Sequence, residues 1–146
     1  MPYFENKNRE PLFYREIGQG KPCILLHGFG QDSRSWLPFV LPFSNDYRFI
    51  LPDLRGYGKS KSAALEESCA LSQFAEDLSC LIEQIGDNDI ILGGYSLGAA
   101  TALQYHKLFG FDRISKYLHI EFPLKFLNED SSLQVQSPGF LFIPYL

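Results

Sequence analysis

The stretch from Ile90 to Ala100 constrains this chain most, because an apolar run ends there in glycines and leads directly into an alanine-rich segment. Its serine, Ser96, stands between Gly94 and Gly98, which gives the pattern G-x-S-x-G at a predicted strand-to-helix turn. Such a turn is sharp, so we expect a strained backbone at Ser96 and small neighbours two residues away on either side. Free N–H groups and the positive end of the following helix favour negative charge beside the hydroxyl. Ser96 is therefore a candidate nucleophile.

The same stretch has a plainer interpretation, a tight strand-to-helix turn with a solvated serine, and the motif alone leaves both interpretations open. Two other motifs are excluded by single residues. A dinucleotide-binding fingerprint requires glycine where Ser96 stands. A phosphate-binding loop that ends in Lys59 and Ser60 requires glycine at the position of Asp53. We therefore expect no cofactor.

Composition is typical of a single globular domain. The 146 residues are 45% hydrophobic and 15% aromatic, which is enough to build a core. The net charge of −4 argues against a nucleic-acid partner, and no apolar run is long enough to span a membrane. The polar segment 1–10 lacks the apolar core of a signal peptide, so we expect a cytoplasmic protein. Cys23, Cys69 and Cys80 have neither metal-binding nor redox spacing, so we expect free thiols and no metal site.

Hydrophobic patterns predict alternating strands and helices. Continuous apolar runs indicate buried strands, and apolar residues at i, i+3, i+4 and i+7 indicate an amphipathic helix that ends at Gly86. We expect a loose lead-in over residues 1–10, strands over 12–17, 23–27, 47–51, from 90 onward and over 114–120, a short proline-limited helix over 33–43, and helices over 71–85 and 97–108. This order is typical of an α/β fold with a mostly parallel sheet, whose ligand site lies beyond the carboxyl ends of the strands. Residues 27–29, 53–55 and Ser96 then converge on that edge.

Three motifs at these strand ends resemble those of the α/β-hydrolase family. They are His27-Gly28-Phe29-Gly30 after one buried strand, residues 53–60 (DLRGYGKS) after the next, and Gly94-Tyr95-Ser96-Leu97-Gly98 after the third. The resemblance covers about residues 10–121 and matches the N-terminal half of the family fold. It implies a three-layer α/β sandwich with a mostly parallel central sheet, truncated at the C-terminal side.

The resemblance also implies roles for individual residues. Ser96 corresponds to the acylating nucleophile, and the backbone N–H groups of Leu97 and Phe29 correspond to the two donors of the oxyanion hole. Such preorganised donors stabilise the charge that develops on the carbonyl oxygen. The supporting loop and turn residues are His27, Gly28, Gly30, Gly94, Tyr95 and Gly98. In this family the histidine shapes the oxyanion loop and is not the base.

Several nearby side chains have two possible roles. Asp53 and Arg55 are expected to organise the loop that follows their strand, because a carboxylate there can accept backbone or guanidinium hydrogen bonds. Tyr95 is expected to pack beside Ser96 or to line a pocket. Trp36 and Phe39 either line an acyl or leaving-group pocket or belong to the core, which is the more usual place for aromatic residues.

The base and the acid of a triad are not where the family has them. The triad order is serine, then acid, then histidine, and only His106 and His119 follow Ser96. At about 1.5 Å per residue, His106 lies roughly 15 Å along its helix from Ser96, whereas proton transfer needs roughly 2.6–3.2 Å. His119 falls within a predicted strand rather than in a loop. Acidic residues also follow Ser96, but no recognisable strand carries them; they are Glu121, Glu129 and Asp130.

The last part of the chain shows no pattern that we can assign. We predict a hydrolase unit over residues 1–121 and an atypical tail over 122–146, as in a truncated or frame-shifted chain. A sheet cut short exposes an edge strand, which predicts self-association.

Three functions follow as hypotheses. The first is a serine hydrolase acting on a small-molecule ester, thioester or amide. The second is a catalytically inactive fragment or binding module. The third is another chemistry of the family, such as cofactor-free haloperoxidation or carbon–carbon bond hydrolysis.

Overall fold

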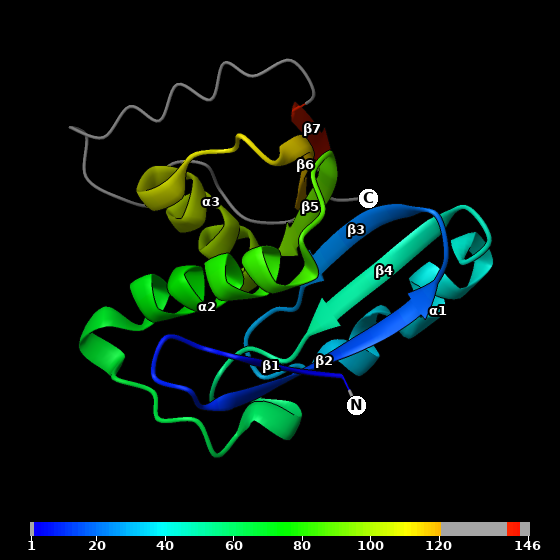
Figure 1. Cartoon of the computed structure of the whole chain (residues 1–146). Coiled ribbons are helices and arrows are strands. Elements are labelled where there is room, and N and C mark those ends of the chain that lie inside the picture. The colour runs from blue at the N-terminus through cyan, green and yellow to red at the C-terminus, as the bar shows by residue number, and fades with distance from the viewer. Residues whose placement is uncertain (1, 121–139, 144–146) are drawn as a thin grey trace.

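A seven-stranded sheet forms the centre of the protein, with strands in the order β1-β2-β4-β3-β5-β6-β7 (Figure 1). The structure is a computed structural model that describes residues 2–120 and 140–143. The strand bounds are β1 Tyr3–Glu5, β2 Pro11–Gly18, β3 Lys21–Leu26, β4 Tyr47–Pro52, β5 Ile90–Tyr95, β6 Ile114–Ile120 and β7 Phe140–Ile143. β1, β2 and β4 pair antiparallel, and all pairs from β4 through β3, β5 and β6 to β7 are parallel. The predicted α/β fold with a mostly parallel sheet is confirmed.

Helices cover both faces of the sheet. The long helices α2 (Ala70–Ile85) and α3 (Leu97–Phe109) lie side by side on one face, and the short α1 (Leu37–Val40) lies on the other (Figure 1). Successive side chains of a strand point to opposite faces of the sheet, so alternate residues of the buried strands pack on the two sides. The α2 and α3 side takes Ile24, Leu26, Ile50, Ile90 and Leu92, and the α1 side takes Cys23, Leu25, Phe49, Leu51 and Ile91.

Helix ends follow the sequence signals closely. α2 ends at Gly86, which adopts a left-handed conformation with φ 72° and donates its N–H to the Ile82 carbonyl. α3 ends at Gly110, as expected. The predicted helix over 33–43 is broken into a 3₁₀ turn (Ser33–Trp36), α1 and a second 3₁₀ turn (Leu41–Phe43). Prolines near the start of the last two segments account for these breaks. Shorter 3₁₀ turns occur at Gly58–Ser60 and Glu67–Cys69.

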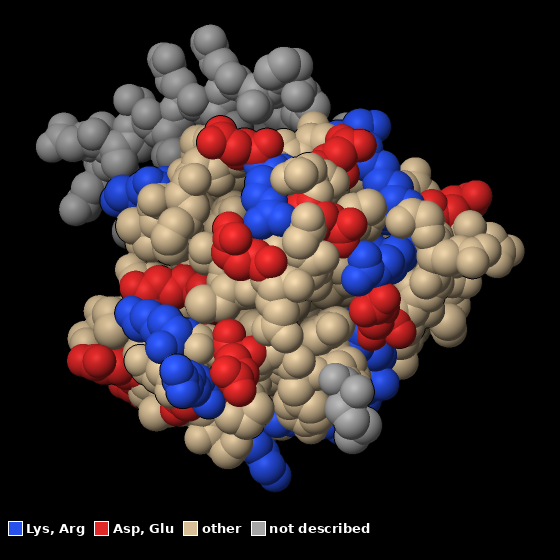
Figure 2. Space-filling view, in the orientation of Figure 1, with Lys and Arg blue, Asp and Glu red and all other residues tan. Residues whose placement is uncertain are grey.

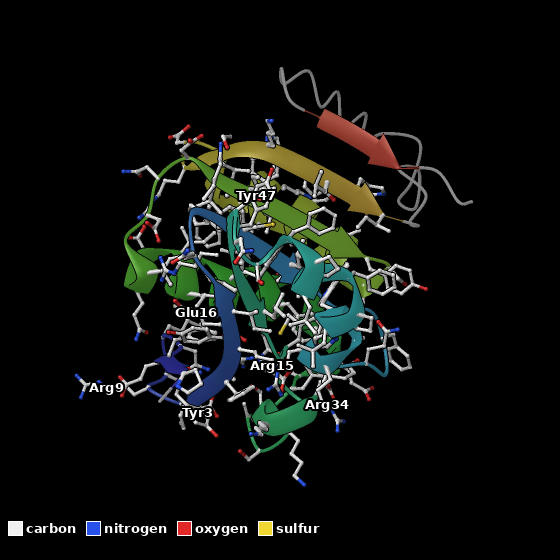
Figure 3. The ribbon with its side chains drawn as sticks, turned by 90° about the vertical axis from the view of Figure 1, so that its right-hand side faces the viewer. Tyr3, Arg9, Arg15, Glu16, Arg34 and Tyr47 are labelled. Atoms are coloured by element: carbon white, nitrogen blue, oxygen red, sulfur yellow. The ribbon has the colours of Figure 1, made fainter. Side chains whose placement is uncertain are left out.

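The prediction of a loose lead-in over residues 1–10 is wrong. Tyr3–Glu5 forms β1, which pairs antiparallel with β2 (Figure 3). Phe4 points inward from this strand and is only 3% exposed. Burial of that ring against the core explains why a segment with little local strand pattern is ordered.

The C-terminal region carries a further strand that the sequence did not predict. β7 pairs with β6 in parallel, from Tyr117 opposite Phe140 to Ile120 opposite Ile143. The predicted boundary between 121 and 122 lies outside the described residues, as does the rest of the predicted tail. β1 and β7 stand at the two ends of the sheet order. Self-association through a sheet edge stays a prediction.

Charged side chains of both signs are interspersed on the face seen in Figure 2. At the end of the sheet opposite to the candidate site, Arg48 pairs with Glu16 of β2 and with Asp87, both at 2.7 Å (Figure 3 labels Glu16). Within the part of the chain that the structure describes, every helix is too short or too polar to cross a membrane.

Candidate active site

Ser96 occupies the turn between β5 and α3 in a strained backbone conformation. Its φ is 51° and its ψ is −111°, in a region of positive φ that residues with a Cβ rarely adopt. The Ser96 N–H donates to the carbonyl of Ile120 at 3.2 Å, so the end of β6 holds the turn in place. The prediction of backbone strain at Ser96 is confirmed. The next residue, Leu97, is the first of α3, where backbone N–H groups have no partner within the helix.

The flanking glycines are required because the backbone approaches itself closely at this turn. A Cβ on Gly94 would overlap the backbone of Gly98 and come 2.5 Å from the Ala99 nitrogen. A Cβ on Gly98 would overlap the Leu26 carbonyl group at the end of β3. Neither obstacle is a flexible side chain that could move aside. The G-x-S-x-G spacing therefore reflects two steric limits, one within the turn and one against the neighbouring strand.

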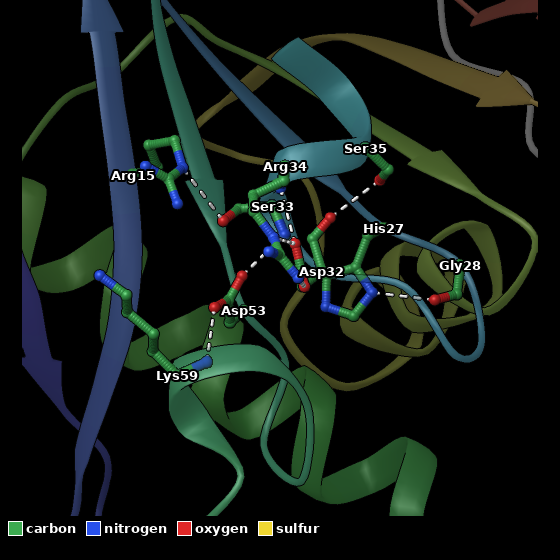
Figure 4. Close-up of polar contacts among 9 residues, drawn as sticks. All are labelled: Arg15, His27, Gly28, Asp32, Ser33, Arg34, Ser35, Asp53 and Lys59. Atoms are coloured by element: carbon green, nitrogen blue, oxygen red, sulfur yellow. Dashed lines mark hydrogen bonds and ion pairs between the residues drawn. The ribbon is translucent and has the colours of Figure 1, made fainter.

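His27 joins the end of β3 to the loop after β4. Its Nε2 accepts the Leu54 N–H at 3.0 Å, so the ring proton must be on Nδ1, which donates to the Gly28 carbonyl at 2.9 Å (Figure 4). The side chain is fully buried, and burial lowers the pKa of the imidazole. Because both ring nitrogens bind the main chain, His27 has the contacts expected of a residue that shapes the loop.

The loop after His27 is closed by Gln31, a residue that the sequence analysis missed. The Gln31 side-chain oxygen accepts the Gly28 N–H at 3.1 Å, and the Gln31 N–H donates to the Gly28 carbonyl at 3.2 Å. On its other side Gly28 meets the Tyr95 ring, since an added Cβ would lie 2.6 Å from the Tyr95 Cδ1. The Tyr95 ring thus packs against the loop after His27. Its expected place beside Ser96 or in a pocket stays a prediction. No sequence pattern marks a glutamine that binds a loop N–H.

Phe29 projects from the same loop and is 80% exposed. Its ring lies edge-on to that of Tyr57, with 6.1 Å between centroids, and Tyr57 in turn lies edge-on to His27 at 5.4 Å. Burial raises the pKa of the Tyr57 phenol. This aromatic row connects the His27 loop to the loop after β4 and leaves one apolar ring open to solvent at the candidate site.

Asp53 and Arg55 organise the loop after β4, as predicted. Asp53 accepts the Ser33 N–H at 2.7 Å with one oxygen and the Lys59 N–H at 2.8 Å with the other (Figure 4). Arg55 forms two hydrogen bonds with Asp77 of α2, at 2.6 and 2.7 Å, in the interior. These bonds raise the pKa of the Arg55 guanidinium. Asp77, the partner that makes this buried charge possible, was not predicted.

The two later histidines lie at different places, His106 half-buried and His119 fully buried. His106 stands in the last turns of α3, where its ring packs edge-on against Phe111 at 4.4 Å. His119 is fully buried in β6 opposite Gly94, and its Nδ1 lies 2.9 Å from the Tyr117 hydroxyl. The three acidic residues named after Ser96 lie outside the described part of the chain.

The remaining candidates divide between core and surface. Trp36 packs on the α1 face of the sheet, which is the core role, whereas Phe39 is 67% exposed and is not core. Cys23 is buried, and burial raises the pKa of its thiol to about 12. Cys69 and Cys80 are also free thiols, as expected. In the described residues, no group of three or more His, Cys, Asp or Glu side chains is placed to hold a metal ion.

Comparison with known proteins identifies the family. A family model described as the alpha/beta hydrolase fold matches residues 21–141. The chain is 32% identical over 121 residues to a putative non-heme chloroperoxidase of Synechocystis, covering 80% of this chain and 43% of that protein. It is 34% identical over 116 residues to epoxide hydrolase 3 of Siraitia grosvenorii, covering 79% of this chain and 36% of that hydrolase.

A solved structure agrees with these sequence relatives. The esterase EaEST of Exiguobacterium antarcticum superposes with a TM-score of 0.74 at 27% identity, over 81% of this chain and 44% of the esterase. The chain thus spans less than half the length of each of these three proteins. The match of the family model over most of the chain shows that this protein belongs to the alpha/beta hydrolase family.

Proposed function

We propose that this chain carries the nucleophile and the oxyanion hole of a serine hydrolase that acts on a small-molecule ester, thioester or amide. Ser96 attacks the substrate carbonyl carbon, and the backbone N–H groups of Leu97 and Phe29 stabilise the resulting oxyanion. The observation that carries this proposal is the backbone of Ser96, with φ 51° in a turn held by two sterically required glycines. A protein retains such strain where a side chain must be presented in one direction.

The oxyanion hole is supported by the position of its two donors. Leu97 is the first residue of α3, so its N–H is not used within the helix. Phe29 follows Gly28 in a loop whose close approach to Tyr95 leaves no room for a Cβ at Gly28. Donors of this kind lower the barrier by about 2.7–4 kcal/mol each in a well-studied hydrolase.

We further propose that the base and the acid of the triad lie outside residues 2–120. His27 uses both ring nitrogens on the main chain, and His106 is more than two helical turns from Ser96. His119 is buried in β6, with its Nδ1 at the Tyr117 hydroxyl. Without a base, a serine is a weak nucleophile, so slow reaction of the chain by itself is expected.

Two other functions have specific support. A catalytically inactive fragment or binding module is favoured by the engagement of His27 elsewhere. A different reaction on the same serine is favoured by the relatives, one of which is named a chloroperoxidase and another an epoxide hydrolase. Both alternatives keep Ser96 in the same turn, so they differ from the first proposal in what the serine does.

Pre-steady-state cleavage of p-nitrophenyl acetate separates these possibilities. We expect a burst of p-nitrophenol that approaches one equivalent, followed by still slower release. The missing base slows both steps, but p-nitrophenolate leaves without a proton, so acylation depends on the base less than the attack of water on the acyl-enzyme does. Ser96→Ala should abolish the burst, and Ser79→Ala, which changes a serine on α2, should retain it. The absence of a burst from the folded chain would favour the inactive fragment. Rapid continuous turnover would show that a base lies within the chain.

A further inference from the structure

Three hydrogen bonds hold the backbone of Gly28. The Gly28 N–H is bound to the Gln31 side-chain oxygen at 3.1 Å. The Gly28 carbonyl accepts the Gln31 N–H at 3.2 Å and the His27 Nδ1–H at 2.9 Å. Gln31 therefore contacts Gly28 twice, through its side chain and through its backbone.

Fixing the Gly28 carbonyl also fixes the Phe29 N–H. The two belong to one planar trans peptide group, in which the C=O and the N–H point in opposite directions. With the carbonyl turned towards His27 and Gln31, the Phe29 N–H faces away from both. That N–H donates to no other described residue, whereas the Gly28 N–H is already occupied. The loop thus presents one free donor.

We propose that Gln31 is a positioning residue of the oxyanion hole. Its side chain holds the Gly28 N–H, which belongs to the preceding peptide group, and its backbone N–H holds the Gly28 carbonyl. Together these contacts limit rotation about the Gly28 Cα and so set the direction of the Phe29 N–H. The inference rests on the proposed function of Ser96, and it adds a specific residue through which the donor is oriented. Gln31 itself is exposed and packs against no core, so its effect on the site comes from these hydrogen bonds and not from burial.

The test combines a structural and a chemical measurement on the full chain. Gln31→Met keeps the length of the side chain but removes the amide oxygen. The matched control is Gln73→Met, because Gln73 also binds a backbone N–H with its side-chain oxygen, that of Glu66 at 2.9 Å, at a surface position on α2. Amide hydrogen exchange measured by NMR follows the Gly28 and Phe29 N–H groups, and mass spectrometry follows the rate of Ser96 phosphonylation by a fluorophosphonate.

We expect Gln31→Met to expose the Gly28 N–H to exchange and to shift the Phe29 amide signal, with the melting temperature unchanged. Phosphonylation of Ser96 should slow by about 3- to 10-fold, less than the roughly 100-fold or more that follows complete loss of a donor. Gln73→Met should change neither the exchange of Gly28 nor the labelling rate.

The outcomes separate the two proposals. A native protein that shows no labelling at Ser96 contradicts the proposed function. The role of Gln31 is then judged on the amide signals alone, and an unchanged Phe29 signal in Gln31→Met overturns it. If Ser96 is labelled, an equal labelling rate in the native protein and in Gln31→Met overturns the role of Gln31 while the proposed function stands.

Discussion

The turn at Ser96 and the loop from His27 to Gln31 lie at the same edge of the sheet but are held in different ways. The turn depends on close backbone contacts, in which Gly98 meets the Leu26 carbonyl and Gly94 meets Gly98. The loop depends on hydrogen bonds that the main chain forms with the buried His27 imidazole and with the side-chain amide oxygen of Gln31. Steric contacts do not titrate, whereas an imidazole does. The turn should therefore be sensitive to a single added methyl group, and the loop to pH and to the loss of a polar side chain.

The largest effect is expected from Gly98→Ala. The new methyl group would overlap the backbone of Leu26, which cannot move without disturbing β3, so we expect a loss of at least about 3 kcal/mol in the free energy of unfolding. Urea denaturation measures it. Gly30→Ala is the matched control, because Gly30 has φ 72° but no atom within 4 Å of an added Cβ. It should cost about 1–2 kcal/mol from backbone strain alone. Equal losses would contradict the steric account of the turn.

His27→Ala tests the loop at its buried end. Truncation leaves the Leu54 N–H without its acceptor and opens a cavity in the interior, so we expect a loss of about 2–4 kcal/mol in the free energy of unfolding. His106→Ala provides the comparison, since the Nδ1 of His106 has no hydrogen-bond partner in the described residues. His106→Ala should lower the free energy of unfolding by less than His27→Ala does. A smaller loss for His27→Ala than for His106→Ala would show that the loop is not held through this ring.

Ser96→Gly is expected to stabilise the protein. Glycine adopts positive φ without a Cβ penalty, and relief of strain should exceed the extra flexibility of the unfolded chain by about 1 kcal/mol. Ser96→Ala retains the Cβ and should change the unfolding free energy little. Thermal and urea unfolding of both variants show whether the change in stability comes from relief of backbone strain or from loss of the hydroxyl group. If Ser96→Ala stabilised as much as Ser96→Gly, the gain would not come from the backbone.

The last comparison concerns the pH dependence of the loop. Burial lowers the pKa of His27 in the folded protein, so the unfolded chain binds the proton more readily. The stability from neutral His27 is complete above the unfolded pKa of about 6.5 and is lost as pH falls from there through the folded pKa, by at most about 1.4 kcal/mol per pH unit.

Urea midpoints at pH 7.5 and pH 5.5, compared between the native protein and His27→Ala, isolate this contribution from the carboxylates. The native protein should lose more stability over this interval than the variant does. Identical pH dependence in the two proteins would mean that His27 does not titrate differently on folding.

The contrast between the two regions also explains what the sequence could predict. The Ser96 turn has a local steric cause, so Gly94 and Gly98 mark it in the sequence, and the buried strands and helices follow from apolar patterns. β1 depends on pairing with β2 and on burial of Phe4, which a polar local sequence does not reveal. β7 likewise depends on its register with β6.

The polar contacts of the site were the least predictable part. The sequence predicts that Asp53 and Arg55 organise the loop, but their partners Ser33, Lys59 and Asp77 come from separate segments. A hydrogen bond between a side chain and a distant backbone group has no spacing rule, because the fold and not the local helix or strand geometry brings the groups together. Gln31 was missed for the related reason that a surface glutamine in a loop has many possible partners.

The most direct test of the central claim is the intact mass of the folded chain after exposure to a fluorophosphonate, with the modified residue located by peptide mapping. We predict a single adduct on Ser96 in the native protein and none in Ser96→Ala. An adduct on another residue, or none on a protein shown to be folded, would contradict the claim that the strained turn presents a reactive serine to the oxyanion donors.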